Sequence, residues 1–331
     1  MRIWLFAVAG LVLAMVVVGG ATRLTGSGLS ITEWQPILGA IPPLSEAAWQ
    51  EAFEKYRHIP QYELVNKGIS LEGFKGIYWW EWSHRLLGRL IFFVYLLPFA
   101  YFLLRRAIPK PFILPVAALL VLGAAQGALG WFMVMSGLSE RVSVSQYRLA
   151  AHLALATAIA AYAFWLALTI RDEQLKGASA TSPSSKLAAI ILAGLVYVQI
   201  VAGAFVAGLH AGLASDTWPL MNGELIPSGM DINFFEDALT AQFVHRLIAY
   251  FIVIYAGVFA LAIWQRPALR LPATALCAAI LAQIALGVAT VVYGVPLAIA
   301  LAHQANAMMV LALALWTIRR TLGARAIKAM Q

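Results

Sequence analysis

Eight stretches of the sequence are long and apolar enough to cross a lipid bilayer as helices, which takes about 20 residues each. They lie near Ile3–Gly20, Ile77–Leu104, Phe112–Met135, Tyr147–Ile170, Leu187–Gly208, Ala238–Trp264, Leu271–Tyr293 and Pro296–Ile318. Of the 331 residues, 62% are hydrophobic and only 11% are charged, whereas soluble domains carry about 25% charged residues. The sequence therefore predicts an all-α integral membrane protein with eight transmembrane helices.

The distribution of Lys and Arg predicts the orientation of these helices. The N-terminus, the even-numbered connections and the C-terminal tail carry 13 basic residues and two acids, whereas the opposite face carries 7 basic residues and 12 acids. Basic residues accumulate on the cytoplasmic side of membrane proteins. We therefore expect both termini in the cytoplasm, with the first segment kept as a helix, and the long 24–76 connection outside. The net charge of +8 reflects this asymmetry and does not indicate nucleic-acid binding.

The chain contains an internal repeat. The stretch GGATRLTGSGLSITEW begins at Gly19, and GAFVAGLHAGLASDTW begins 184 residues later at Gly203. In the same order, SHRL matches VHRL, QGALG matches QIALG, and AAHLALA matches LAHQANA. An even number of helices per half means that both halves enter the membrane the same way. We predict two tandem four-helix bundles, 1–170 and 186–331, joined by a cytoplasmic linker at 171–185 and related by a pseudo-two-fold axis along the membrane normal.

Four of the six histidines fit this repeat. His58 lies in the long outer connection and is expected to be solvated, and His210 ends the fifth segment. The other four precede the cytoplasmic arginine of their segment by 16 to 21 residues, which is roughly 24–32 Å of helix. They head the second, fourth, sixth and eighth segments: His84, His152, His245 and His303. All four are therefore predicted at similar depth near the outer side, with one pair in each half.

A histidine pair within a four-helix unit is typical of a haem site, because haem iron takes two axial imidazoles and the flat ring fits between helices. Gly127, Gly130 and Gly287 would make room for the ring, and Arg85 and Arg246 are candidate partners for the propionates. Isolated histidines at helix ends are usually interfacial, but four in register favour haem. No carboxylate or thiolate recurs beside the pairs, which argues against zinc or copper.

Glu81 breaks the symmetry of the repeat. It precedes His84 by three residues and so shares a helix face with it, whereas the equivalent residue in the second half is Gln242. The asymmetry predicts chemistry in the N-terminal half and a structural or electron-carrying haem in the C-terminal half. The alternative is that Glu81 is only a charge at the start of a helix. The neighbouring tryptophans are expected to form an aromatic belt at the membrane surface.

Taken together, these motifs resemble the haem A synthase family. The resemblance covers nearly the whole chain and rests on GGATRLTGSGLSITEWQPILGAIPPL, NKGISLEGFKGIYWWEWSHRLLGR, YRLAAHLALA, TAQFVHRLIAY and LAHQANAM. It implies that the chain oxidises the C8 methyl group of haem O to a formyl group by successive hydroxylations, as part of haem A biosynthesis for cytochrome c oxidase. Some members carry a cysteine pair in the first outer connection. The single cysteine here is Cys277, so the chain resembles the cysteine-free type of proteobacteria and mitochondria.

The resemblance also implies roles for the candidate residues. The substrate haem would be held in the N-terminal half by His84 and His152, and a haem b in the C-terminal half by His245 and His303. Glu81 matches the essential acid of the family.

The resemblance implies partners and a location as well. The partners are haem O and haem A, haem O synthase, cytochrome c oxidase assembly proteins and an electron acceptor that the sequence does not identify, while a homo-oligomer is left open. The location is the bacterial inner membrane, with the haem sites toward the periplasmic side.

Two rival functions belong to other classes. A di-haem b-type cytochrome that only transfers electrons would share the histidine pairs, and the contrast between Glu81 and Gln242 argues against it. A transporter would share the parallel repeat. It would need polar residues near the bilayer midplane, and the midplanes of both halves are apolar.

Overall fold

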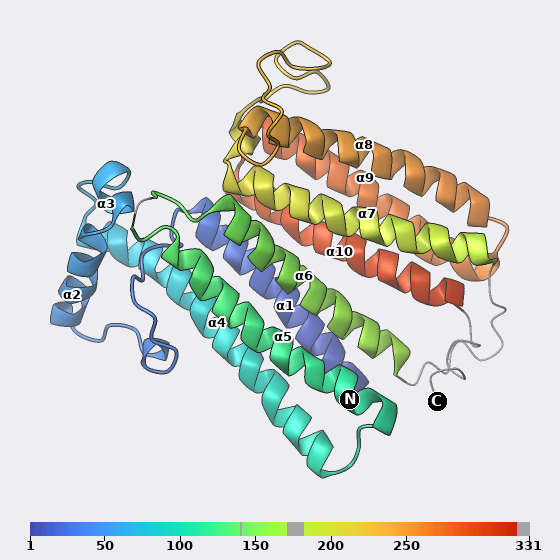
Figure 1. Cartoon of the computed structure of the whole chain (residues 1–331), viewed down its shortest axis with the longest axis horizontal. Helices are drawn as coiled ribbons and strands as arrows, with labels where there is room; N and C mark the ends of the chain where they lie inside the picture. The colour runs from blue at the N-terminus through green and yellow to red at the C-terminus, as the bar shows by residue number, and fades with distance from the viewer. Residues whose placement is uncertain (140, 171–181, 323–331) are drawn as a thin grey trace.

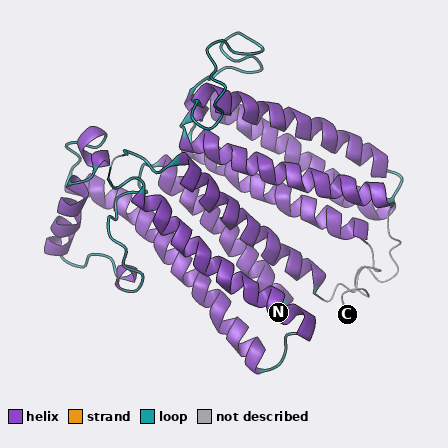
Figure 2. Cartoon of the chain, viewed as in Figure 1, coloured by secondary structure: helices purple, strands orange, loops and turns teal. Residues whose placement is uncertain are grey.

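The structure is a computed structural model that describes residues 1–139, 141–170 and 182–322. These residues form helices and loops (Figure 2), and no β-strand occurs within these ranges. All eight predicted segments are helices long and apolar enough to cross a membrane. Their bounds are α1 Arg2–Leu24, α4 Leu71–Leu104, α5 Lys110–Met135, α6 Gln146–Thr169, α7 Pro183–Gly208, α8 Ala238–Ile263, α9 Pro267–Val292 and α10 Leu297–Leu322.

The long helices form two groups of four (Figure 1). In the first, α1 packs on α4 and α6, and α5 also packs on α4 and α6, which closes a ring. In the second, α7 and α9 each pack on α8 and α10 in the same way. These rings place α4 opposite α6 and α8 opposite α10. The pseudo-two-fold axis and the domain division at 170 and 186 stay predictions.

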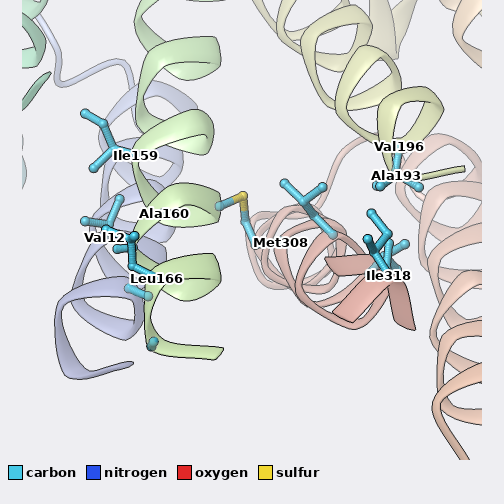
Figure 3. Packing of buried hydrophobic residues seen from close by; sticks show 14 of the residues in the cluster. Val12, Ile159, Ala160, Leu166, Ala193, Val196, Met308 and Ile318 are labelled. Atoms are coloured by element: carbon cyan, nitrogen blue, oxygen red, sulfur yellow. The ribbon is translucent and has the colours of Figure 1, made fainter. Parts of the chain in front are cut away.

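One hydrophobic core joins the two rings. Helices α1 and α6 of the first ring contact α10 of the second, and α6 also contacts α7. Figure 3 shows Val12, Ile159 and Ala160 on one side of Met308, with Ala193 and Val196 of α7 beyond it. The outward faces of α4, α5, α8 and α9 carry exposed leucine, isoleucine and valine side chains, as expected of helices that face lipid.

Helix α7 begins earlier than the sequence predicts. Residues 171–181 lie outside the described part of the chain. The last three residues of the predicted linker, 183–185, belong to α7. Pro183 occupies the first helical position, where its missing N–H costs nothing. The Ser182 side chain caps the helix by accepting from the Ser185 backbone N–H at 3.3 Å, so the helix starts four residues before Leu187.

Helix α4 is longer than predicted and begins at Leu71 instead of Ile77. The Ser70 hydroxyl caps it by accepting from the Gly73 backbone N–H at 3.1 Å. Its 34 residues span about 51 Å, whereas the hydrocarbon core of a bilayer is about 30 Å thick. Helix α4 is therefore longer than one crossing of the hydrocarbon core requires.

The outer connection between α1 and α4 folds against the first turns of α4. It contains α2 Glu46–Arg57, α3 Pro60–Leu64 and a 3₁₀ turn, η1, at Leu38–Ala40. Trp49, Phe53 and Tyr56 of α2 pack on Phe74 and Tyr78 of α4, with ring centroids 4.9 Å apart for Trp49 and Tyr78. We call residues 25–70 the outer cap. His58 ends α2 and is exposed, which confirms its prediction.

Candidate haem-binding and catalytic site

The four candidate histidines lie on opposite helices of the two rings. His84 is on α4 and His152 on α6, the two helices that lie opposite each other in the first ring. His245 on α8 and His303 on α10 lie on opposite helices of the second ring. The histidines lie six or seven residues after the starts of α6, α8 and α10, close to the predicted positions, and 13 residues after the start of α4, which is longer than predicted. Each predicted pair therefore lies on opposite helices of one ring.

A glycine on the neighbouring helix faces each of the four imidazoles. A Cβ atom built on Gly19 would lie 3.1 Å from His84 Nε2, and one built on Gly203 would lie 3.2 Å from His245 Cε1. At Gly130 and Gly287 a Cβ would lie 2.9 Å from the Cε1 atom of His152 and of His303. At Gly130 and Gly287 a Cβ would force an atom to move, and at Gly19 and Gly203 it would make a tight contact. A Cβ on Gly127 would meet no atom within 4 Å, so Gly127 does not contact an imidazole. That Gly127, Gly130 and Gly287 make room for a haem stays a prediction.

We expect Gly130→Ala to displace the His152 ring and lower the haem content of the N-terminal half, and Gly287→Ala to do the same at His303. The measurement is haem bound per purified protein together with its absorption spectrum. Gly123→Ala on the same helix as Gly130 is the matched control, because its methyl group meets open space and the residue has no predicted role at the site. An equal loss in all three variants would show that helix propensity, and not contact with the ring, is responsible.

Three of the histidines also contact a glutamine. Gln126 Nε2 lies 3.1 Å from His152 Nδ1 and donates to the His152 carbonyl at 3.1 Å. Gln199 Nε2 lies 3.2 Å from His245 Nε2 and donates to the His245 carbonyl at 2.9 Å. Gln283 Nε2 lies 3.2 Å from His303 Nδ1. Each glutamine limits the rotation of the imidazole next to it.

Unpaired polar atoms beside these rings fit a metal-bound imidazole. Within the described residues, the Oε1 atoms of Gln126 and Gln199 are buried without a hydrogen-bond partner, as is His245 Nδ1. When one ring nitrogen holds a metal, the other carries a proton and needs an acceptor. The described part of the chain contains no group of three or more His, Cys, Asp and Glu side chains. Two imidazoles on opposite helices are the axial ligands that a haem iron takes.

The Glu81 carboxylate is buried and fully hydrogen-bonded. Its residue is 2% exposed, and Oε2 accepts from the Ser30 hydroxyl and the Ile31 backbone N–H, both at 2.8 Å. Oε1 accepts from Arg85 Nη2 at 2.7 Å and Nε at 3.1 Å. Since every contact is a donor, the arrangement suits the charged carboxylate. Glu81 lies ten residues inside α4, so the alternative of a charge at the helix start is wrong.

The equivalent position in the second ring has a different hydrogen-bond pattern. Gln242 is also buried, and its Nε2 donates to the Ser215 carbonyl at 2.9 Å. Ser215 is the repeat equivalent of Ile31, whose N–H donates to Glu81. The outer loop therefore offers a donor to the carboxylate in one half and an acceptor to the amide in the other. The carbonyls of Ile31 and Ser215 accept from the equivalent arginines, Arg85 and Arg246, in both halves. The two halves therefore differ in side-chain charge and in which backbone group contacts Glu81 or Gln242.

Both candidate propionate arginines bind the outer loops. Arg85 donates to the carbonyls of Ile31 and Glu33 at 2.7 and 2.9 Å, and Arg246 donates to that of Thr217 at 2.8 Å. Arg85 and Arg89 also line a cavity of about 360 Å³ between α4 and the outer cap. The contact of Arg85 and Arg246 with propionates stays a prediction.

The outer cap holds the loop that binds Glu81. Gln61 of α3 donates to the Gly26 carbonyl at 3.1 Å, and Asn66 donates to the Tyr56 hydroxyl at 2.7 Å. Burial raises the pKa of Tyr56, the hydrogen bond from Asn66 opposes this, and the charge of Glu81 adds to the rise. The cap is therefore close enough to Glu81 for its charge to be felt at Tyr56.

Similarity to known proteins identifies the family of this chain. Residues 2–315 match the model of the COX15-CtaA family, described as cytochrome oxidase assembly protein. The chain belongs to this family. Proteins named heme A synthase are similar to it over nearly their whole length. That of Parvibaculum lavamentivorans is 50% identical over 328 residues, covering 96% of this chain and 93% of the relative. That of Azorhizobium caulinodans is 51% identical, covering 94% and 90%.

A third relative of the same name, from Nitrosospira multiformis, is 48% identical over 325 residues. The family match over residues 2–315 spans both rings and the outer cap, so the positions of all four histidines, Glu81 and the glutamines lie within it. Sequence reasoning missed the glutamines as site residues, although each stands four residues before the glycine that faces the same imidazole: Gln126 before Gly130, Gln199 before Gly203 and Gln283 before Gly287. That spacing is the signal that could have found them.

Proposed function

We propose that the protein is a haem A synthase that converts haem O to haem A. The C8 methyl group and one water molecule give a formyl group, four protons and four electrons in total. The conversion passes through an alcohol and a geminal diol, which loses water to give the aldehyde. The electrons go to an acceptor outside this chain. The family match and the relatives named heme A synthase support this proposal.

The two histidine pairs divide the work between the rings in this proposal. His84 and His152 bind the substrate haem, and His245 and His303 bind a resident haem b, which when bound supplies an electron-carrying centre. The buried acid supports this division, because Glu81 is present in the first ring and the neutral Gln242 takes its place in the second.

Glu81 is the catalytic group of the proposed reaction. It lies one helical turn from His84, and a carboxylate there stabilises positive charge on the carbon being oxidised or accepts a proton from the attacking water. Ser30, Ile31 and Arg85 hold it in one orientation. The observation that carries the proposal is this single buried carboxylate beside one histidine pair and its absence from the equivalent place in the other.

The proposed location follows from charge and length. The eight spans make the chain a multi-pass membrane protein, and the excess of Lys and Arg places both termini in the cytoplasm. The histidines and the outer cap then face the periplasm of a bacterial inner membrane. Haem O synthase would deliver the substrate, and cytochrome c oxidase assembly proteins would receive the product.

The experiment that tests the proposed function is analysis of the pigment in the purified protein by pyridine haemochrome spectra and mass spectrometry. Haem O, its 8-hydroxymethyl derivative or haem A alongside haem b is the expected result. Haem b as the sole pigment, in cells that make haem O, would instead favour an electron-transferring cytochrome.

The C-terminal pair gives a separate prediction. We expect His245→Ala and His303→Ala each to remove the low-spin spectrum of the resident haem, because a haem iron that loses one imidazole becomes five-coordinate or dissociates. The measurement is reduced-minus-oxidised absorption and haem content of the purified variants. His58→Ala, in an exposed residue of the outer cap, is the control. Unchanged spectra in both His245→Ala and His303→Ala would contradict the assignment of these histidines as haem ligands.

A further inference from the structure

The four histidines are not equally supported by their surroundings. The pattern of a glutamine four residues before a ring-facing glycine occurs on α5, α7 and α9. On α1 the ring-facing glycine is Gly19, and the residue four positions before it is Met15. Met15 and Gln199 are equivalent in the 184-residue repeat. His84 is therefore the one candidate ligand whose neighbouring helix offers a thioether where the other three offer an amide.

The Met15 side chain takes a different path from that of the glutamines. Its Cε atom lies 3.1 Å from where a Cβ of Gly88 would be, one turn after His84 on α4. Gln199, at the equivalent place, donates to the His245 carbonyl and contacts that imidazole. The residue equivalent to Gly88 in the second ring is Ala249. Gly88 thus leaves room for an apolar side chain beside α4 at the level where the other ring holds a hydrogen-bonding amide.

This difference changes how firmly each histidine holds iron. Hydrogen bonds to the outer edge of a ligating imidazole fix its orientation and raise its basicity, and their loss typically lowers metal affinity about 10–100-fold. The amide nitrogens of Gln126, Gln199 and Gln283 lie against their imidazoles, and those of Gln126 and Gln199 also donate to the backbone carbonyl of the same histidine. A methionine has no N–H to donate in their place. Iron bound between His84 and His152 therefore has one braced ligand and one unbraced ligand. Iron bound between His245 and His303 has two braced ligands.

We propose that Met15 makes His84 the more weakly held axial ligand of the substrate haem, the one that leaves the iron first, and that His152 is the more firmly held ligand. The inference rests on the proposed function and deepens it. A substrate must enter and its product must leave, so both ligands release the iron in every cycle, and one weakly held ligand makes the first of these steps fast. A resident haem has no such requirement, and both of its histidines are braced by Gln199 and Gln283.

Carbon monoxide binding to the dithionite-reduced, haem-loaded full-length protein tests this proposal without measuring turnover. Carbon monoxide binds a six-coordinate ferrous haem only after one imidazole leaves, so its rate reports ligand release. We expect the wild-type protein to react at the substrate haem and to be inert at the C-terminal haem. Met15→Gln should slow the reaction about 10–100-fold, and Gln199→Met should make the C-terminal haem reactive.

Met15→Leu is the matched control and should keep the wild-type rate, because it exchanges one apolar side chain for another. An unchanged rate in Met15→Gln, or a C-terminal haem that stays inert in Gln199→Met, overturns the proposal. Haem content is measured in every variant, which separates slow release from poor loading. His84→Ala separates a failure of the proposed haem ligation from a failure of the inference about Met15. If it leaves the haem content and spectrum unchanged, the proposed ligation fails; if it removes the N-terminal signal while Met15→Gln has no effect, only this inference fails.

Discussion

Glu81→Gln is expected to bind haem while its production of haem A falls roughly 10²–10⁴-fold, the usual contribution of a positioned acid or base. Haem O or its alcohol should then accumulate. The amide removes the charge, and its NH₂ group must face either Arg85 or the donors of Ser30 and Ile31. One buried donor then lacks an acceptor, which costs about 1–3 kcal/mol. The measurement is chromatography of haem O, alcohol and haem A from cells that express the variant.

Two controls separate the charge of Glu81 from its structural contacts. Ser30→Ala removes one donor to the carboxylate and leaves the charge and the Arg85 pair in place, so its haem A output should fall far less. The low-spin spectrum of the C-terminal haem should survive in Glu81→Gln, as a sign of intact folding. Near-normal haem A from Glu81→Gln would show that the carboxylate only holds the outer loop.

His152→Ala is expected to abolish haem A and to empty the N-terminal site, while the haem between His245 and His303 remains. His84→Ala should also abolish haem A. Both follow from the position of the two imidazoles on opposite helices of one ring, with Gln126 and Gly130 shaped around the His152 side chain. Haem content and type per protein in purified variants are the measurement.

The histidine variants also discriminate between the rival functions. A protein that only transfers electrons would lose its N-terminal haem in His152→Ala, but no haem A would have formed in the wild type either. Haem A in the wild type and its loss in both variants, with the C-terminal spectrum intact, is the result that the synthase proposal requires.

The periodic part of the fold could be predicted because membrane spans depend on length and apolar composition alone. Helix ends were harder. The first turns of α4 are not apolar, and they are helical because Ser70 caps them and the aromatic residues of α2 pack on Phe74 and Tyr78. The helices of the outer cap could not be predicted from apolar length, because they do not span the membrane. The spacing of Trp49, Phe53 and Tyr56 places these side chains on one helix face, but their partners lie on a helix whose start was misplaced.

The candidate site could be predicted where the repeat made it visible. Two copies in register identified the histidine pairs, and the break in symmetry identified Glu81. The partners of Glu81 could not be found in this way, because a backbone N–H such as that of Ile31 leaves no trace in side-chain chemistry. The glutamines were visible only as part of matching motifs. Their contacts with His152, His245 and His303 depend on how neighbouring helices face each other, which the spacing along one helix does not specify.

The packing of α1 against α10 implies an order in which the two halves assemble during membrane insertion. The first span synthesised rests on the last one, and Gln304 donates across this contact to the Val16 carbonyl at 3.0 Å, beside Gly20, which has no room for a Cβ. During translation, α1 and α6 can close the first ring as soon as the fourth span has been inserted. Their faces toward α10 then stay in lipid until that helix has been inserted, while α6 can already meet α7. Pairing of the two halves is thus completed only by α10, and a truncated chain that lacks α10 keeps only the contact between α6 and α7.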